Sequence, residues 1–280
     1  MGKVISKDGT TIAFDRLGEG PAIILVGGAL SYRSHAKQVQ LVELLAKHFT
    51  VINYDRRGRG DSSDTLPYAV DREIEDIEAL IDEAGGSAFV YGMSSGAILA
   101  LDATNKLSNK IKKLVVFEPP LILDNSRPPL PEDYVEQINE SIAAGNPSEA
   151  VDIFLTQAVL IPPEYLPAIK NSDPMWKDFD AVAHTLAYDG IIAKDVMAGK
   201  PLPPNKWSSA TSPTLVISGG NSEKFFHDAA KAIINNLADA KYYVLQGQGH
   251  DVAPEAIAPV LVEFLNGTGQ SFVAATNKKN

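Results

Sequence analysis

Short runs of mostly apolar residues recur along this sequence, and most of them end at glycine or at a polar residue. The runs at 22–26, 49–53 and 88–91 lack the apolar–polar alternation of a strand with one exposed face. Strands buried on both faces, as in a parallel sheet, show this pattern. The chain is therefore predicted to fold around a parallel sheet.

Helical patterns separate these runs. In residues 72–83 the apolar side chains Ile74, Ile77, Leu80 and Ile81 share one helical face, and 97–107 is a second helical stretch. Further apolar runs are expected to form strands at 113–117, 214–218 and 242–245, with helices near 224–237 and 254–265. Residues 3–17 alternate around a Lys-Asp-Gly turn, which is typical of a hairpin. The alternation of strand and helix indicates an α/β fold.

One long segment interrupts this alternation. Between Pro119 and Pro213 the strand signal disappears, and proline-punctuated helical stretches at 132–144 and 147–160 replace it. We expect a core made of residues 1–120 and 209–272, a helical insertion at 121–208, and a frayed tail at 273–280.

Composition narrows the function classes. The 25 basic and 35 acidic side chains leave a net charge of −10, which repels phosphate backbones and anionic lipid. A small-molecule partner is therefore expected, with no nucleic acid and no membrane. The absence of cysteine excludes disulfides, thiolate metal sites and a cysteine nucleophile. The apolar runs are far shorter than the roughly 20 residues of a membrane span, and we expect a cytoplasmic protein. Monomer and homodimer both remain open.

A candidate nucleophile lies where the run 88–91 gives way to a helix. Residues 92–96 read Gly-Met-Ser-Ser-Gly, which matches the G-x-S-x-G turn of a nucleophile elbow. In so tight a turn, a Cβ at position 92 or 96 would clash with neighbouring backbone, which favours Ser94 over Ser95 as the nucleophile. The backbone N–H of Ser95, at the helix start, is expected to point toward a developing oxyanion.

A serine hydroxyl needs a base, and the chain has five histidines. His250 lies in the glycine-rich loop 247–251 after the last predicted strand, where parallel sheets gather catalytic groups. The other four, in helical or surface-like stretches, are interpreted as structural. No two histidines are spaced four apart on one helix and no H-x-E cluster occurs, so no metal site is expected, and no cofactor.

Taken in order, these motifs resemble the α/β-hydrolase superfamily over nearly the whole chain. They are the strand end 23–28, the D-x-R-G-x-G-x-S match at 55–62, the Ser94 elbow and His250. The resemblance implies an eight-stranded, mostly parallel sheet flanked by helices, a helical cap inserted after the sixth strand, and a Ser/acid/His triad. It also implies that the arginines of 55–62 form a structural turn, and that the backbone N–H of Ala29 is the second oxyanion donor.

The acid departs from the commonest pattern of that superfamily, which places it three residues after the glycine that ends the seventh strand. Counting from Gly219 reaches Ser222, which cannot stabilise an imidazolium by charge. Glu118, 24 residues after Ser94, stands at the end of the sixth strand, as the acid does in haloalkane dehalogenases and zearalenone-type lactonases. Dehalogenases use an aspartate nucleophile, which Ser94 excludes. Glu118 is favoured, and Glu223 is the alternative. The competing interpretation is that Glu118 is a charged residue at a strand end that faces solvent and has no catalytic role.

These residues predict acyl transfer to water, with a small to medium carboxylic ester or lactone as substrate. Substrate choice is expected to depend on the cap, whose aromatic and sulfur side chains either line a pocket or pack on each other. The candidates are Trp176, Trp207, Tyr134, Phe154 and Met175, together with Met93 of the elbow. The competing hypotheses are a ligand-binding or sensor protein with little turnover, and a C–C bond hydrolase, lyase or perhydrolase of the same fold.

Overall fold

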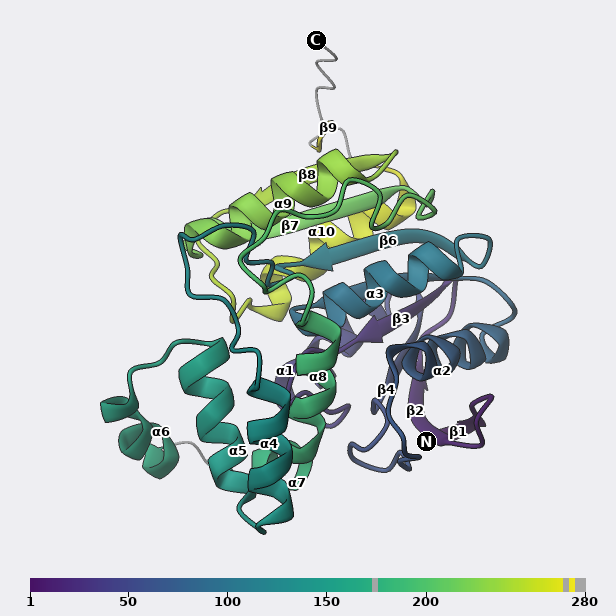
Figure 1. The fold of residues 1–280 in the computed structure, drawn as a ribbon. Helices are drawn as coiled ribbons and strands as arrows, with labels where there is room; N and C mark the ends of the chain where they lie inside the picture. The colour runs from purple at the N-terminus through teal and green to yellow at the C-terminus, as the bar shows by residue number, and fades with distance from the viewer. Residues whose placement is uncertain (173–175, 269–271, 275–280) are drawn as a thin grey trace.

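The computed structural model describes residues 1–172, 176–268 and 272–274, and its centre is one sheet (Figure 1). In the described part of the chain nine strands lie in the order β1-β2-β4-β3-β5-β6-β7-β8-β9. Their bounds are β1 Gly2–Ile5, β2 Thr11–Leu17, β3 Ala22–Val26, β4 Thr50–Tyr54, β5 Ala88–Met93, β6 Ile111–Phe117, β7 Thr214–Gly219, β8 Ala240–Leu245 and β9 Val273–Ala274. Strands β3 to β8 run parallel, while β1, β2 and β9 pair antiparallel. The expected mostly parallel sheet of eight strands is confirmed, with β9 added at its edge.

The short strand β9 corrects one boundary. Residues 273 and 274 were expected in a frayed tail, but they pair with Tyr242 and Lys241 of β8. The edge of β8 offers backbone donors and acceptors that an adjacent segment can satisfy, and Phe272 packs edge-on against Tyr243 and Phe264. Residues 275–280 of that expected tail lie outside the described residues.

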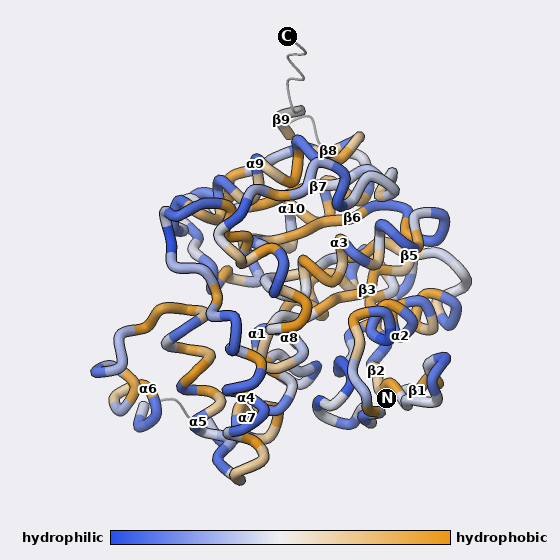
Figure 2. Tube along the Cα trace, in the orientation of Figure 1, coloured by the Kyte–Doolittle hydropathy of each residue, from blue (hydrophilic) through white to orange (hydrophobic). Residues whose placement is uncertain are grey.

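Helices cover both faces of the sheet. On one face lie α2 (Val70–Glu83), α3 (Ser95–Lys106) and α9 (Lys224–Asn236), and on the other α1 (Ala36–Leu45) and α10 (Pro254–Asn266). Consecutive residues of β3 alternate between the two cores: Ile24 and Val26 pack with the first layer, Ile23 and Leu25 with the second. Figure 2 shows the apolar residues concentrated along the strands. Burial on both faces explains the continuous apolar runs in the sequence.

The helical insertion after β6 is also confirmed. It contains α4 (Tyr134–Ala143), α5 (Pro147–Ile153), a π-helical turn (Phe154–Ala158), a 3-10 turn (Pro163–Tyr165), α6 (Leu166–Ser172), α7 (Trp176–Val182), a second 3-10 turn (Ala183–Thr185) and α8 (Leu186–Ala193). In Figure 1 these helices form a separate layer at one end of the sheet. That layer has its own apolar cluster, which includes Tyr134, Ile138 and Leu186 and also takes in Leu30 from the loop after β3. Among the described residues, no helix is long and apolar enough to cross a membrane.

Candidate active site

Ser94 occupies a strained turn between β5 and α3. Its backbone has φ 56° and ψ −129°, a conformation that non-glycine residues rarely adopt. A Cβ on Gly92 would lie 2.6 Å from the carbonyl oxygen of Gly96, and one on Gly96 would lie 2.4 Å from that of Val26. The steric expectation for glycine at these two positions is confirmed. The turn lifts the Ser94 side chain out of the sheet toward the loops at its carboxyl end.

His250 and Glu118 complete a chain of close contacts from Ser94. The Nε2 atom of His250 lies 3.2 Å from Ser94 Oγ, and its Nδ1 atom lies 2.7 Å from Glu118 Oε2. The second carboxylate oxygen of Glu118 accepts the backbone N–H of Gly219 at 2.7 Å. With the imidazole proton on Nδ1, Glu118 accepts that proton in a hydrogen bond and Nε2 is free to accept the Ser94 hydroxyl.

The interpretation in which Glu118 faces solvent is wrong, because the residue is 0% exposed. The alternative candidate for the acid, Glu223, has a side chain that is 64% exposed and accepts a hydrogen bond from Arg127 Nη1 at 2.6 Å. The structure therefore connects His250 to Glu118. The ring of Phe226 stacks on His250, with centroids 4.7 Å apart and planes 12° apart, and supports the imidazole from one side.

The loop after β3 closes on the nucleophile. A Cβ on Gly28 would lie 2.9 Å from Ser94 Cβ, so only glycine permits this approach. The next residue, Ala29, lines the same cavity as Ser94 and Ser95. The two segments expected to supply oxyanion donors thus both adjoin Ser94 at this cavity.

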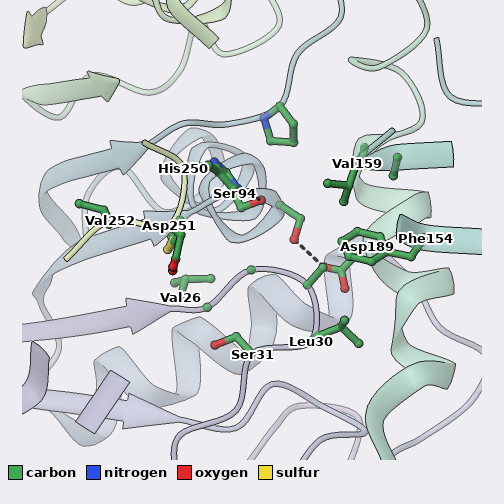
Figure 3. A pocket seen from close by; sticks show the side chains of 18 of the residues that line it. Val26, Leu30, Ser31, Ser94, Phe154, Val159, Asp189, His250, Asp251 and Val252 are labelled. Carbon is green, nitrogen blue, oxygen red and sulfur yellow. Dashed lines mark hydrogen bonds between the residues drawn. The ribbon is translucent and has the colours of Figure 1, made fainter. Parts of the chain in front are cut away.

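These groups form the floor of a mainly apolar cavity of about 570 Å³. Figure 3 shows Ser94 and His250 on one side of it and Phe154 and Val159 of the insertion on the other. Three of the side chains predicted to line a pocket do so: Met93, Tyr134 and Phe154. Met175 lies outside the described residues.

The two tryptophans are not among the residues that line this cavity, and both pack in apolar layers, the second of the two alternatives that the sequence leaves open. Trp207 is 0% exposed, packs in the core beside α3 and donates its indole N–H to Asp102 Oδ1 at 2.7 Å. Trp176 packs inside the insertion and donates its indole N–H to Ser148 Oγ at 2.9 Å. Both belong to packed layers, because each indole has a polar partner there and buries its large apolar surface.

Several cavity residues were missed at the sequence level. Arg127, Phe225 and Phe226 line the cavity, as does Asp189 of α8. Asp189 accepts a hydrogen bond from Ser95 Oγ at 2.7 Å. No motif or spacing relates position 189 to position 95, so only the packing of α8 against α3 could reveal that contact.

Comparisons with known proteins identify the family and the fold. Residues 23–260 match the model of the alpha/beta hydrolase family. The solved structure of an alpha/beta hydrolase from Sphaerobacter thermophilus is 50% identical, with a TM-score of 0.86 over 94% of this chain and 100% of that one. An enol-lactonase from Burkholderia xenovorans shares the fold, at 21% identity and a TM-score of 0.69 over 95% of this chain and 100% of that one.

Among curated proteins, hydrolase YraK of Bacillus subtilis is 31% identical over 120 residues. That match spans 41% of this chain and 43% of the relative, so it covers less than half of either protein. The family model, in contrast, extends from β3 into α10 and includes the elbow, the insertion and the His250 loop. On that match, the chain belongs to the alpha/beta hydrolase family.

Proposed function

We propose that this protein is a serine hydrolase that cleaves carboxylic esters or lactones of small to medium size through an acyl-enzyme on Ser94. The observation that carries the proposal is the continuous chain of contacts from Ser94 Oγ through His250 to the buried Glu118. A nucleophile, a base and a group that orients the base are the parts that acyl transfer needs.

The mechanism follows from this arrangement. Ser94 Oγ attacks the carbonyl carbon of the substrate while His250 Nε2 takes the hydroxyl proton. The backbone N–H groups of Ala29 and Ser95 stabilise the oxyanion of the tetrahedral intermediate. His250 returns the proton to the leaving oxygen as its bond to carbon breaks. Water then attacks the acyl-enzyme by the same two proton transfers and releases the acid.

The size and lining of the cavity support the substrate class. Its volume of about 570 Å³ lies within the roughly 300–1,000 Å³ of sites for drug-sized ligands. Its mainly apolar walls suit an acyl chain or an unsubstituted lactone ring more than a peptide or a sugar. The structural likeness to an enol-lactonase is consistent with a lactone among the substrates.

The test is a panel of p-nitrophenyl esters and of simple and macrocyclic lactones, hydrolysed by the native protein and by Ser94→Ala. We expect kcat of the variant to fall by at least about 10⁴-fold on every substrate that the native protein hydrolyses. The matched control is Ser212→Ala. Ser212 is a buried serine just before β7, and its Oγ donates to the carbonyl of Ile111 at the start of β6, the end away from Glu118. Its kcat should stay within about twofold of the native value.

Two results would overturn the proposal. One is full turnover by Ser94→Ala. The other is a native protein that hydrolyses no member of the panel and whose Ser94 does not react with a fluorophosphonate, because an activated serine would be labelled. Stabilisation by bound esters without turnover would instead favour a ligand-binding protein, and turnover of C–C substrates alone would favour a lyase or C–C hydrolase.

A further inference from the structure

A buried charge cluster lies directly beside the proposed catalytic groups, and the mechanism does not use it. Asp189 of α8 is 5% exposed and accepts three hydrogen bonds from other elements. Its Oδ1 accepts from Ser95 Oγ at 2.7 Å and from Arg56 Nη1 at 2.7 Å, and its Oδ2 accepts from Arg59 Nη2 at 2.6 Å. Figure 3 shows the bond to Asp189 as a dashed line at the cavity wall. A residue of the insertion thus contacts the residue that follows the nucleophile.

The same two arginines also bind the loop after β3. Arg59 Nη1 donates to the carbonyl oxygens of Gly28 at 2.6 Å and Ser31 at 3.1 Å, and Arg56 Nη1 lies 3.4 Å from that of Gly27. These carbonyls flank the peptide N–H of Ala29. Arg56 and Arg59 therefore contact both segments of the proposed oxyanion hole. They bind the loop after β3 through its backbone carbonyls, and they bind the start of α3 through Asp189, which accepts the Ser95 hydroxyl.

The charges of the cluster balance. Arg56 also pairs with Glu73 of α2, with Nε and Nη2 donating at 2.7 and 2.6 Å, so two buried arginines face two buried carboxylates. Burial raises the pKa of the Asp189 carboxyl, but the guanidinium groups of Arg56 and Arg59 outweigh it and leave that pKa below its ordinary value. Asp189 therefore stays ionised at neutral pH and is a constant acceptor for the Ser95 hydroxyl.

We propose that Asp189 is a positioning residue for the oxyanion hole, acting with Arg56 and Arg59 to set the spacing between the N–H groups of Ala29 and Ser95. The inference rests on the proposed hydrolase function. Oxyanion stabilisation works because the donors are in place before charge develops, and a misplacement of about 1 Å can lower the rate about 100-fold. The helical insertion is then part of the catalytic machinery as well as the roof of the cavity.

The experiment separates transition-state stabilisation from substrate binding in Ser95→Ala and Asp189→Asn. Ser95→Ala removes only the hydroxyl and keeps the backbone N–H, while Asp189→Asn keeps the shape of the side chain and removes its charge. We expect kcat to fall about 10-fold in Ser95→Ala and about 10- to 100-fold in Asp189→Asn, with KM for a p-nitrophenyl ester within about threefold of the native value.

A trifluoromethyl ketone supplies a second readout that a merely structural role would not change. Ser94 Oγ adds to its carbonyl carbon, the hydroxyl proton moves to His250, and the resulting alkoxide occupies the oxyanion hole. We expect the inhibition constant of the ketone to rise in each variant by about the same factor as kcat/KM falls. An unreactive ketone analogue, the corresponding methyl ketone, should bind with nearly unchanged affinity.

Two controls match these variants in chemistry and burial. Ser212→Ala removes another serine hydroxyl that is 5% exposed, and Asp76→Asn weakens a buried carboxylate–arginine pair made with Arg57 of the same loop. Neither Ser212 nor Asp76 lines the cavity in the described part of the chain. Both controls should lose some stability while kcat and the inhibition constant stay within about twofold of the native values.

The outcomes are distinct. Folded Ser95→Ala and Asp189→Asn proteins with native kcat and native inhibition constant would overturn the inference and leave the hydrolase function intact. Equal losses of kcat in the two controls would also overturn it, because the effect would then be a general one of buried polar pairs. Retained turnover in Ser94→Ala, in contrast, would overturn the hydrolase function itself.

Discussion

Two adjacent serines at one turn lead to two different buried carboxylates. From Ser94 the contacts run through His250 to Glu118, at the end of a strand, and from Ser95 they run directly to Asp189, on a helix of the insertion. Glu118 is 0% exposed and Asp189 is 5% exposed. Burial is thus nearly the same for the two acids, and what differs is the set of partners.

The partners determine what each carboxylate can do. Asp189 faces two guanidinium groups, which carry their protons at any pH a protein tolerates. Glu118 faces an imidazole, a group that can bind and release a proton, and one backbone N–H. The cluster of Asp189 with Arg56 and Arg59 therefore holds backbone and side-chain groups in place, whereas the contact of Glu118 with His250 supports proton transfer by the imidazole. Whether a buried carboxylate holds other groups in place or supports proton transfer therefore depends on whether its partner can titrate.

The largest expected effect tests the Glu118 side of the comparison. Glu118→Gln keeps the shape of the side chain but removes the charge that orients and stabilises the imidazolium, so kcat should fall by about 10²- to 10⁴-fold. The matched variant is Glu223→Gln, whose carboxylate pairs with Arg127 and is largely exposed; its kcat should fall less than about tenfold. Ester hydrolysis at saturating substrate measures both. A larger loss in Glu223→Gln than in Glu118→Gln would reverse the assignment of the acid.

The next prediction concerns the free energy of unfolding, to which the ion pairs of Asp189 contribute. In Asp189→Ala, Arg56 keeps Glu73 as its carboxylate partner, while Arg59 stays buried with no carboxylate partner among the described ion pairs. Such a loss lowers the free energy of unfolding by about 3–5 kcal/mol. Asp228→Ala removes a carboxylate that pairs with exposed Lys224 and Lys231, and should lower it by less than about 1 kcal/mol. Urea unfolding measures both. Equal losses would show that the buried cluster contributes no more than a surface pair.

The pH dependence of stability sharpens the same point. Because the pKa of Asp189 is lowered in the folded protein, its contribution is present above the ordinary carboxyl pKa of 3.8 and is lost as pH falls through the lower folded value. The melting temperatures of the native protein and Asp189→Asn should therefore differ most near pH 7 and converge below about pH 4. Thermal unfolding from pH 7 to pH 3 measures the difference. A difference that grew as pH fell would contradict the assigned direction.

The smallest effects separate the two kinds of aromatic residue in and near the insertion. Phe154→Ala removes a cavity wall, and KM should rise about tenfold with a smaller change in kcat. Trp207→Phe removes the donor to Asp102 and should lower the free energy of unfolding by about 1–3 kcal/mol while KM stays unchanged. Steady-state kinetics and urea unfolding of the two variants test this. A changed KM in Trp207→Phe would return that residue to the binding site.

The sheet and the elbow could be predicted because their signals are local. Continuous apolar runs report burial on both faces, and β3 was predicted at Ala22–Val26, the bounds that the structure has. Gly92 and Gly96 report close backbone approach, which the short distances from their virtual Cβ atoms confirm. The preference for Glu118 over Glu223 came from a resemblance instead, because Glu118 follows the sixth strand as the acid does in haloalkane dehalogenases and zearalenone-type lactonases.

The tryptophans show where local signals stop. The local sequence does not distinguish an indole that packs in a core from one that lines a cavity, because both need apolar surroundings and one polar partner. For Trp207 the partner is Asp102, 105 positions away in the chain. Long-range pairing of this kind leaves no periodicity or motif, so the position of the ring follows from the packing of the whole molecule.

Local sequence patterns predict the parallel sheet, the tight turn at Ser94, the loop that carries His250 and the helical insertion, since each depends on the steric and solvation preferences of neighbouring residues. Long-range packing, in contrast, buries Glu118 against His250, keeps the tryptophans out of the cavity lining, and brings Asp189 to Ser95 between two arginines. These are contacts between segments far apart in the chain, and their free energy depends on distance and burial that no local stretch encodes.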